Sequence, residues 1–219
     1  MNKAFIFDMD GVLINSERTW DKYEKEIFNR IFGEKIAAKI GDTLGLGPNK
    51  VYERAVEAGF KESIEYYYKE LDKEMDFIYS SSKLTNKIDF LAEKLKEMGF
   101  KIGLVSASRL GWIHMVLPRL KFEKDFSVII STDDSPHLKS KPHPDGYLEA
   151  IEKLKASPET TIVLEDSNHG IKSGKDAGAY VIGFREHLLS GFVQTGADAY
   201  ADNVSEVIKL VEEFLKRHD

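Results

Sequence analysis

Short apolar segments alternate with helical patterns along most of this chain, and the alternation limits the folds available to it. Five segments have the length and composition of buried strands: residues 4–7, 102–105, 128–130, 162–164 and 181–184. Amphipathic patterns predict helices over residues 86–98, after Ser108, from Pro144, after Ser167 and over residues 204–216. This order favours an α/β fold in which a doubly wound parallel sheet has helices on both faces.

One long segment departs from the alternation. Residues 17–32, 48–58 and 61–80 each have a helical pattern, and no convincing strand pattern interrupts them. We therefore expect an all-helical cap domain, residues 15–82, inserted after the first strand of a core domain. The core would consist of residues 1–14 and 83–219, with hinges near Asn15 and Ser82.

Composition excludes several classes of protein. The 219 residues include 31 Lys and Arg against 37 Asp and Glu, a formal net charge of −6, and no basic cluster that would indicate a nucleic-acid binder. No apolar stretch approaches the roughly 20 residues that span a membrane, and the first residues lack a signal-peptide pattern. Without cysteine, disulfides and thiolate chemistry are excluded. We expect a cytoplasmic monomer or small homo-oligomer with no nucleic-acid or membrane partner.

Acidic side chains follow two of the predicted strands directly. Asp8 and Asp10 follow the first strand, and Glu165 and Asp166 follow residues 162–164. Ligands bind at the carboxyl ends of strands in open α/β sheets, and carboxylates gathered there would repel one another unless a cation lay between them. An all-oxygen set of ligands suits Mg²⁺. The alternative is that the two strands are far apart and that each acidic pair is an ordinary turn.

Two further motifs favour the binding of an anion. Ser106-Ala107-Ser108 follows a predicted strand and precedes a helix, where backbone N–H groups and the helix dipole favour phosphate. Lys141 precedes a proline-rich turn that would hold its ammonium group beside the acids. Taken alone, the serines also fit a helix cap, and the lysine also fits a solvated loop.

The order and types of these motifs resemble those of the haloacid dehalogenase-like phosphotransferase superfamily, in the subgroup with a helical cap after the first strand. The resemblance covers residues 5–13, 102–108, 141–150 and 163–183. The stretch from Leu164 to Ala179 is especially similar to the phosphoglycolate phosphatase and β-phosphoglucomutase branch. The resemblance implies a Rossmann-like core and a small phosphorylated metabolite as the substrate.

The resemblance also implies how the acids act. Asp8 would be the nucleophile that forms an aspartyl-phosphate, and Asp10 would be the general acid and base. Mg²⁺ would be bound by Asp8, the backbone carbonyl of Asp10, and Asp166, with Glu165 as a direct or water-mediated ligand. A Mg²⁺-dependent phosphatase is the activity that these roles imply.

The remaining roles concern the substrate. By the same resemblance, Ser106, the Ala107 amide and Lys141 would bind the phosphoryl oxygens. Trp20 and Glu24 share a helix face near the hinge and are predicted substrate contacts, and Arg109 is a third candidate.

Two alternatives to a phosphatase stay open. One is a mutase that returns the phosphoryl group to its sugar, and the other is a non-catalytic binding protein on the same fold. Departures from the mutase pattern favour hydrolysis. Trp20 stands where β-phosphoglucomutases have a cap histidine, Pro48 where they have a cap arginine, and Asn15 where this branch usually has an acid.

Overall fold

A parallel six-stranded sheet forms the centre of the molecule. The computed structural model describes residues 2–41, 43 and 46–218, and within them the strand order is β3-β2-β1-β4-β5-β6. The strands are β1 (Asn2–Phe7), β2 (Phe100–Ser106), β3 (Phe126–Ser131), β4 (Ala156–Glu165), β5 (Tyr180–Phe184) and β6 (Ala199–Ala201). All neighbouring strands run parallel, so the predicted α/β fold is confirmed.

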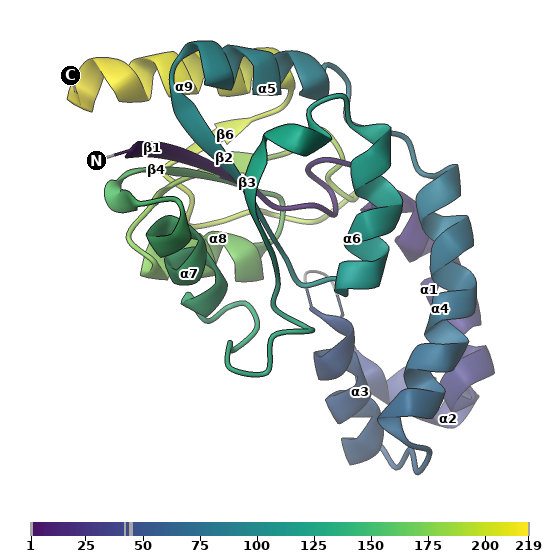
Figure 1. The fold of residues 1–219 in the computed structure, drawn as a ribbon. Helices are drawn as coiled ribbons and strands as arrows, with labels where there is room; N and C mark the ends of the chain where they lie inside the picture. The colour runs from purple at the N-terminus through teal and green to yellow at the C-terminus, as the bar shows by residue number, and fades with distance from the viewer. Residues whose placement is uncertain (1, 42, 44–45, 219) are drawn as a thin grey trace.

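Helices cover both faces of this sheet (Figure 1). One face has α5 (Ile88–Glu97) and α9 (Val204–His218), and the other has α7 (Asp145–Lys153) and α8 (Asn168–Asp176). Because side chains alternate along a strand, Phe5 and Phe7 of β1 join the buried cluster that includes residues of α5 and α9. Ala4 and Ile6 join the other cluster, with residues of α7 and α8. A strand buried on both faces needs a continuous apolar run, which is what residues 4–7 provide.

Some element boundaries differ from those predicted. Helix α5 begins at Ile88 rather than at residue 86 because Lys87 has a left-handed backbone, with φ of 59°. Strand β6 was not predicted because it is only three residues long and reads Ala-Tyr-Ala. A short helix, α6 (Leu110–Val116), follows β2, and the 3₁₀ turns η1 (Leu117–Arg119) and η2 (Glu123–Asp125) lead into β3.

Four helices lie together beyond the carboxyl ends of the strands (Figure 1). They are α1 (Ser16–Phe32), α2 (Glu34–Ile40), α3 (Pro48–Glu57) and α4 (Ile64–Ser81), and we call them the helical segment. Its described residues contain no strand, as expected, although α2 was not predicted. The chain enters and leaves this segment side by side, since Asn15 N donates to Lys83 O at 2.8 Å and Ile14 pairs with Leu84. The division into domains at residues 15 and 82 stays a prediction.

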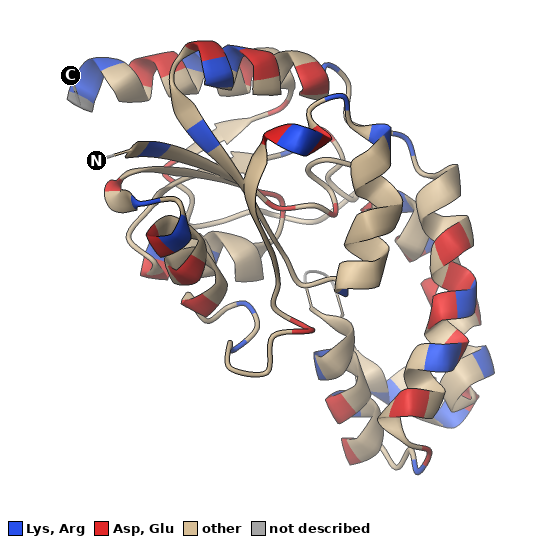
Figure 2. Cartoon of the chain, in the orientation of Figure 1, with Lys and Arg blue, Asp and Glu red and all other residues tan. Residues whose placement is uncertain are grey.

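The surface has charges of both signs. Figure 2 shows acidic and basic residues interspersed along α4, α5 and α9. Among the described residues, none of the helices combines the length and the apolar composition that a membrane crossing requires.

Candidate active site

The predicted site residues meet at one edge of the sheet. Asp8 directly follows β1, Glu165 ends β4, and Ser106 ends β2 on the other side of β1. Strands β1 and β4 are neighbours, with Phe7 paired to Leu164, and Asp8 N donates to Leu164 O at 3.0 Å. The two acidic pairs are therefore adjacent, and the alternative of two distant acidic turns is excluded.

Three of the acids form a cluster with the donor chemistry of a hard cation. Asp8, Glu165 and Asp166 each offer a carboxylate oxygen, and these oxygens all lie within 4.8 Å of one another. Gly11 makes room for the cluster, because a Cβ on it would lie 1.9 Å from Asp166 Oδ2. An all-carboxylate group of this size fits Mg²⁺ or a similar divalent cation.

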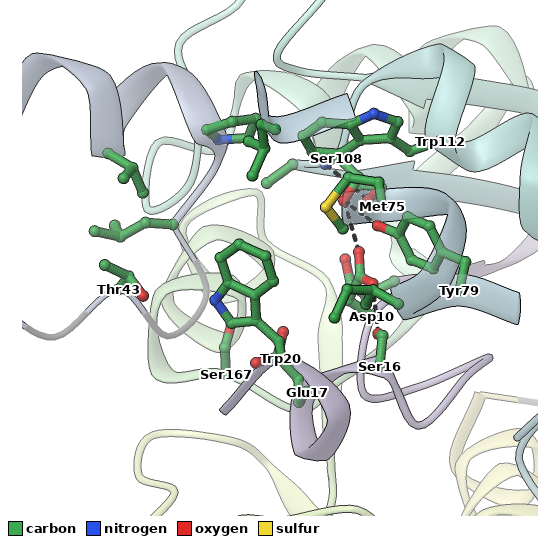
Figure 3. Close-up of a pocket in the computed structure, with 18 of the residues that line it drawn as sticks. Asp10, Ser16, Glu17, Trp20, Thr43, Met75, Tyr79, Ser108, Trp112 and Ser167 are labelled. Carbon is green, nitrogen blue, oxygen red and sulfur yellow. Dashed lines mark hydrogen bonds between the residues drawn. The ribbon is translucent and has the colours of Figure 1, made fainter. Parts of the chain in front are cut away.

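Asp10 points away from the cluster, into the space between the sheet and the helical segment. Its Oδ1 accepts a hydrogen bond from Ser16 Oγ at 2.5 Å, and its Oδ2 accepts one from Ser108 Oγ at 2.7 Å (Figure 3). Burial raises the pKa of Asp10, and these two hydrogen bonds oppose the rise. The carboxyl group is thus held in one orientation, and its pKa is moved toward the range useful for proton transfer.

Lys141 is buried between two of the acids. Its Nζ donates to Asp8 Oδ1 at 2.6 Å, to Glu165 Oε1 at 2.5 Å and to Val105 O at 3.3 Å. Burial alone would lower the pKa of Lys141, but Asp8 and Glu165 raise it well above its usual value. The lysine therefore remains a cation, and it partly neutralises the acidic cluster.

The acids themselves are strained electrostatically. Burial raises the pKa of Asp8 to about 8, since Lys141 offsets only part of the desolvation and Glu165 and Asp10 add repulsion. Burial and the neighbouring carboxylates Glu17, Glu165 and Asp8 likewise raise the pKa of Asp166 well above its usual range. A divalent cation in the cluster would reverse both shifts, because positive charge favours ionised carboxylates.

Glu165 is immobilised by its surroundings. Its Oε1 accepts from Tyr147 Oη at 2.7 Å as well as from Lys141, and its Oε2 accepts from the backbone amides of Asp166 and Ser167. Gly170 leaves the space for it, since a Cβ there would lie 1.8 Å from Oε1. Because both carboxylate oxygens of Glu165 are already hydrogen-bonded, this residue is suited to contact a cation through water and to position Lys141.

A cavity of about 100 Å³ joins these groups to the helical segment. Its walls include Asp8, Asp10, Asp166 and the three predicted phosphate ligands Ser106, Ala107 and Lys141. In the loop, Ser108 N donates to Ser106 Oγ at 3.0 Å, which fixes the turn after β2. The motifs that the sequence places far apart thus line one space.

Only one of the three predicted substrate contacts lines the cavity. Trp20 lines the cavity, but Glu24 is not among the lining residues. Its Oε1 accepts a hydrogen bond from Trp20 Nε1 at 2.8 Å and another from Thr43 Oγ1. Arg109 also lies outside the lining, paired with Asp72. Of the three, only Trp20 is in a position to touch a substrate in this conformation.

Among the lining residues that were not predicted, Glu17 and Tyr79 bring ionisable groups close to Asp10. Glu17 lies three positions before Trp20, on the same face of α1, and burial and the repulsion of Asp10 raise its pKa well above its usual range. Tyr79 Oη lies 3.2 Å from Ser108 Oγ, next to the bond between Ser108 and Asp10 (Figure 3). The i, i+3 spacing to Trp20 is a signal that would have identified Glu17. The position of Tyr79 in the cavity depends on how α4 packs, which the sequence pattern does not show.

The fold and the site define an α/β protein with an acidic cluster at the carboxyl edge of its sheet and a helical segment above it. The chain belongs to the haloacid dehalogenase-like hydrolases, because the sequence profile of that family matches residues 5–184. The resemblance predicted from the motifs is therefore confirmed.

Several relatives match over most of their length. Hexitol phosphatase B of Escherichia coli is 33% identical over 180 residues, which cover 80% of this chain and 79% of the relative. Pyrophosphatase PpaX of Bacillus cereus is 29% identical over 184 residues, covering 79% and 78%. The solved structure of CbbY from Rhodobacter sphaeroides has a TM-score of 0.74 at 20% identity, over 94% of this chain and 96% of that one. A suggested β-phosphoglucomutase from Thermotoga maritima has a TM-score of 0.69 at 26% identity, over 96% and 99%.

Proposed function

We propose that this chain is a Mg²⁺-dependent phosphatase that hydrolyses a small phosphorylated metabolite through an aspartyl-phosphate. The observation that carries the proposal is that Asp8 and Asp10 line one cavity together with Ser106 and Lys141. A nucleophile, a proton donor, a hydroxyl and a cation are what the transfer of a phosphoryl group to a carboxylate requires. The names of the two phosphatase relatives support the same activity.

The reaction would take place in two steps. In the first, an oxygen of Asp8 attacks phosphorus, the new bond to Asp8 forms as the ester P–O bond breaks, and Asp10 gives a proton to the departing alcohol. In the second, Asp10 takes a proton from a water molecule that attacks the same phosphorus, and the bond to Asp8 breaks. Inorganic phosphate leaves, and both aspartates return to their starting states.

The other residues of the site would neutralise and orient the phosphoryl group. Asp8, Asp166, the Asp10 carbonyl and, through water, Glu165 would hold the cation. Mg²⁺, when bound there, withdraws charge from the phosphoryl oxygens. Lys141 and the Ser106 hydroxyl would bind further oxygens of the same group, with the Ala107 amide.

A phosphosugar mutase is the second candidate, because the suggested β-phosphoglucomutase from Thermotoga maritima aligns with nearly the whole chain. The mutase and the phosphatase share the first step and differ in whether water or a sugar hydroxyl accepts the phosphoryl group. Product analysis separates them, since one releases phosphate and the other an isomerised sugar phosphate. A non-catalytic binding protein, the cytoplasmic location and the oligomeric state stay predictions.

The proposal is tested by phosphate release from sugar phosphates, phosphoglycolate and 4-nitrophenyl phosphate. Each is assayed with Mg²⁺, with a chelator, and with the Asp8→Asn variant. We expect metal-dependent release that Asp8→Asn lowers by about 10³-fold or more, because a nucleophile has no substitute. The matched control is Asp176→Asn, which removes an exposed carboxylate paired with Lys172 and should be neutral. Release from no ester would contradict the proposal, and β-glucose 1-phosphate would then be tested for isomerisation.

A further inference from the structure

The wall of the cavity that faces away from the sheet is mostly apolar. Helices α1, α3 and α4 contribute Trp20, Val51, Leu71, Met75 and Ile78 to it. Figure 3 shows Trp20 and Met75 near Asp10, the group that would give its proton to the leaving alcohol. The organic part of a bound ester would therefore lie against this wall.

Positive charge is scarce around this space. Among the described residues that line the cavity, Lys141 is the one cation, and it is already paired with Asp8 and Glu165. The lining also has the carboxyl groups of Asp10, Glu17 and Asp166. Residues 42, 44 and 45, whose structure is not described, are Asp, Leu and Gly in the sequence, so they add no cation.

Arg109 does not supply positive charge to the cavity. Its guanidinium carbon lies 3.9 Å from the centroid of the Tyr68 ring. Its Nη1 lies 3.3 Å from Asp72 Oδ2, and its Nε lies 3.7 Å from Asp134 Oδ1. The carboxylates of Asp72 and Asp134 and the Tyr68 ring thus hold Arg109 outside the cavity lining. The two carboxylates offset its charge there.

We propose that this enzyme selects phosphate monoesters whose phosphate is their only charged group, with a compact, uncharged and largely apolar leaving group, and that it rejects esters with a second anion. The inference rests on the proposed phosphatase function. A carboxylate or second phosphate on the substrate would lose its water beside Glu17 with no cation to pair with. An unpaired charge in such a place is strongly unfavourable, so the cavity discriminates by the cost of desolvating the second anion as well as by fit.

A matched pair of esters tests the inference. Phosphoglycolate and 2-hydroxyethyl phosphate have the same length and differ in that a carboxylate replaces a hydroxymethyl group. Propyl phosphate adds an apolar leaving group, and 4-nitrophenyl phosphate reports whether the site hydrolyses phosphate esters at all. We expect kcat/KM for 2-hydroxyethyl and propyl phosphate to exceed that for phosphoglycolate by about 100-fold or more.

A variant that adds a cation provides the converse test. Met75→Lys places an ammonium group in the apolar wall. We expect it to raise kcat/KM for phosphoglycolate, relative to kcat/KM for 2-hydroxyethyl phosphate, by about 10-fold or more. Met115→Lys makes the same exchange on α6 at a position that is 38% exposed, and it should leave the ratio unchanged. If Met75→Lys fails to fold, as judged by circular dichroism, the ratio measured for the natural chain decides.

The outcomes separate the two proposals. Hydrolysis in which phosphoglycolate equals or exceeds 2-hydroxyethyl phosphate would overturn the inference and leave the phosphatase function in place. The same holds if Met115→Lys changes the ratio as much as Met75→Lys does. No metal-dependent hydrolysis of any ester, 4-nitrophenyl phosphate included, would overturn the phosphatase function and the inference together.

Discussion

At the residue scale, the site depends on one buried cation among several acids. The Lys141 side chain is 4% exposed and bridges Asp8 and Glu165. Buried charges are tolerated where they are paired and hydrogen-bonded, and removing one partner leaves the others uncompensated. Lys141 would therefore have two roles, since it keeps the acids together and, in the proposed reaction, would bind the phosphoryl group.

Replacing this cation should be far more harmful than replacing its neighbour in the sequence. We expect Lys141→Ala to lower kcat/KM by about 10²- to 10³-fold, and to lower the free energy of unfolding by about 3 kcal/mol, because Asp8 and Glu165 then face each other unpaired. Lys139 is exposed, so Lys139→Ala should stay within about twofold of the natural chain. Steady-state kinetics and urea unfolding provide both readouts, and equal losses in the two variants would contradict this role.

Most of the predicted site residues could be located from the sequence because each directly follows an apolar strand. Because Asp8, Ser106 and Asp166 lie at the carboxyl ends of parallel strands, they share one edge of the sheet. Glu24 was predicted from a helix face and Arg109 from its place directly after Ser108, and the structure places both outside the cavity lining. Which face of a helix meets a cavity depends on packing between elements, and a periodic pattern does not contain that information.

At the element scale, the helical segment also contacts the core at the loop after β3. Asp133, just after β3, accepts hydrogen bonds from Asn49 N at 3.0 Å and Tyr68 Oη at 2.5 Å. Asn49 Nδ2 also donates to Asp133 O at 3.1 Å. These bonds tie α3 and α4 to the sheet, so they stabilise the closed arrangement in which the cavity is covered.

Weakening this contact should allow the helical segment to move away from the core. We expect Tyr68→Phe to raise KM by about 10-fold or more with a smaller change in kcat, because a hydrogen bond to a charged carboxylate contributes roughly 1.5–3 kcal/mol. Tyr66→Phe is the matched control, since Tyr66 lies on the same helix and is 40% exposed. Kinetics on 4-nitrophenyl phosphate measure both. A Tyr68→Phe enzyme with an unchanged KM would show that the contact with Asp133 does not hold the helical segment against the core.

The elements that could not be predicted are those with little apolar signal. Helix α2 is seven residues long, and Ile40 is its one buried residue. Strand β4 extends back to Ala156 through residues that are partly exposed, so only its buried end, residues 162–164, was apparent. Long buried elements leave a periodic pattern in the sequence, whereas short or half-exposed ones are determined by their neighbours.

At the scale of the whole molecule, the acidic site opposes folding in the absence of a cation. A carboxyl whose pKa is raised on folding stabilises the protein below its unfolded pKa, and this contribution is lost as the pH rises through the folded value. For Asp8 that window runs from its ordinary pKa of 3.8 to the folded pKa of about 8. Asp166 is shifted in the same direction. The metal-free protein therefore loses stability from this site as the pH rises.

A divalent cation should restore that stability, and more of it at higher pH. Because Mg²⁺ competes with protons for Asp8 and Asp166, we expect the increase in Tm on adding Mg²⁺ to be larger at pH 8 than at pH 6, by about 2–4 °C for each kcal/mol gained. Differential scanning fluorimetry with and without a chelator measures it. Asp166→Asn should abolish the increase. An increase that is equal at both pH values, or that survives Asp166→Asn, would contradict the assigned cation site.

Asp8 is the residue that we propose accepts the phosphoryl group. The most direct test mixes 4-nitrophenyl phosphate and Mg²⁺ with an Asp10→Asn variant, quenches with acid, and maps the phosphorylated peptide by mass spectrometry. This ester has a leaving group that needs no proton, so the first step should proceed while the second, which needs Asp10, is slowed. We predict a phosphoryl group on Asp8 that is absent when Asp8→Asn is added. Release of 4-nitrophenol with phosphate attached to another residue, or to none, would show that Asp8 is not the nucleophile.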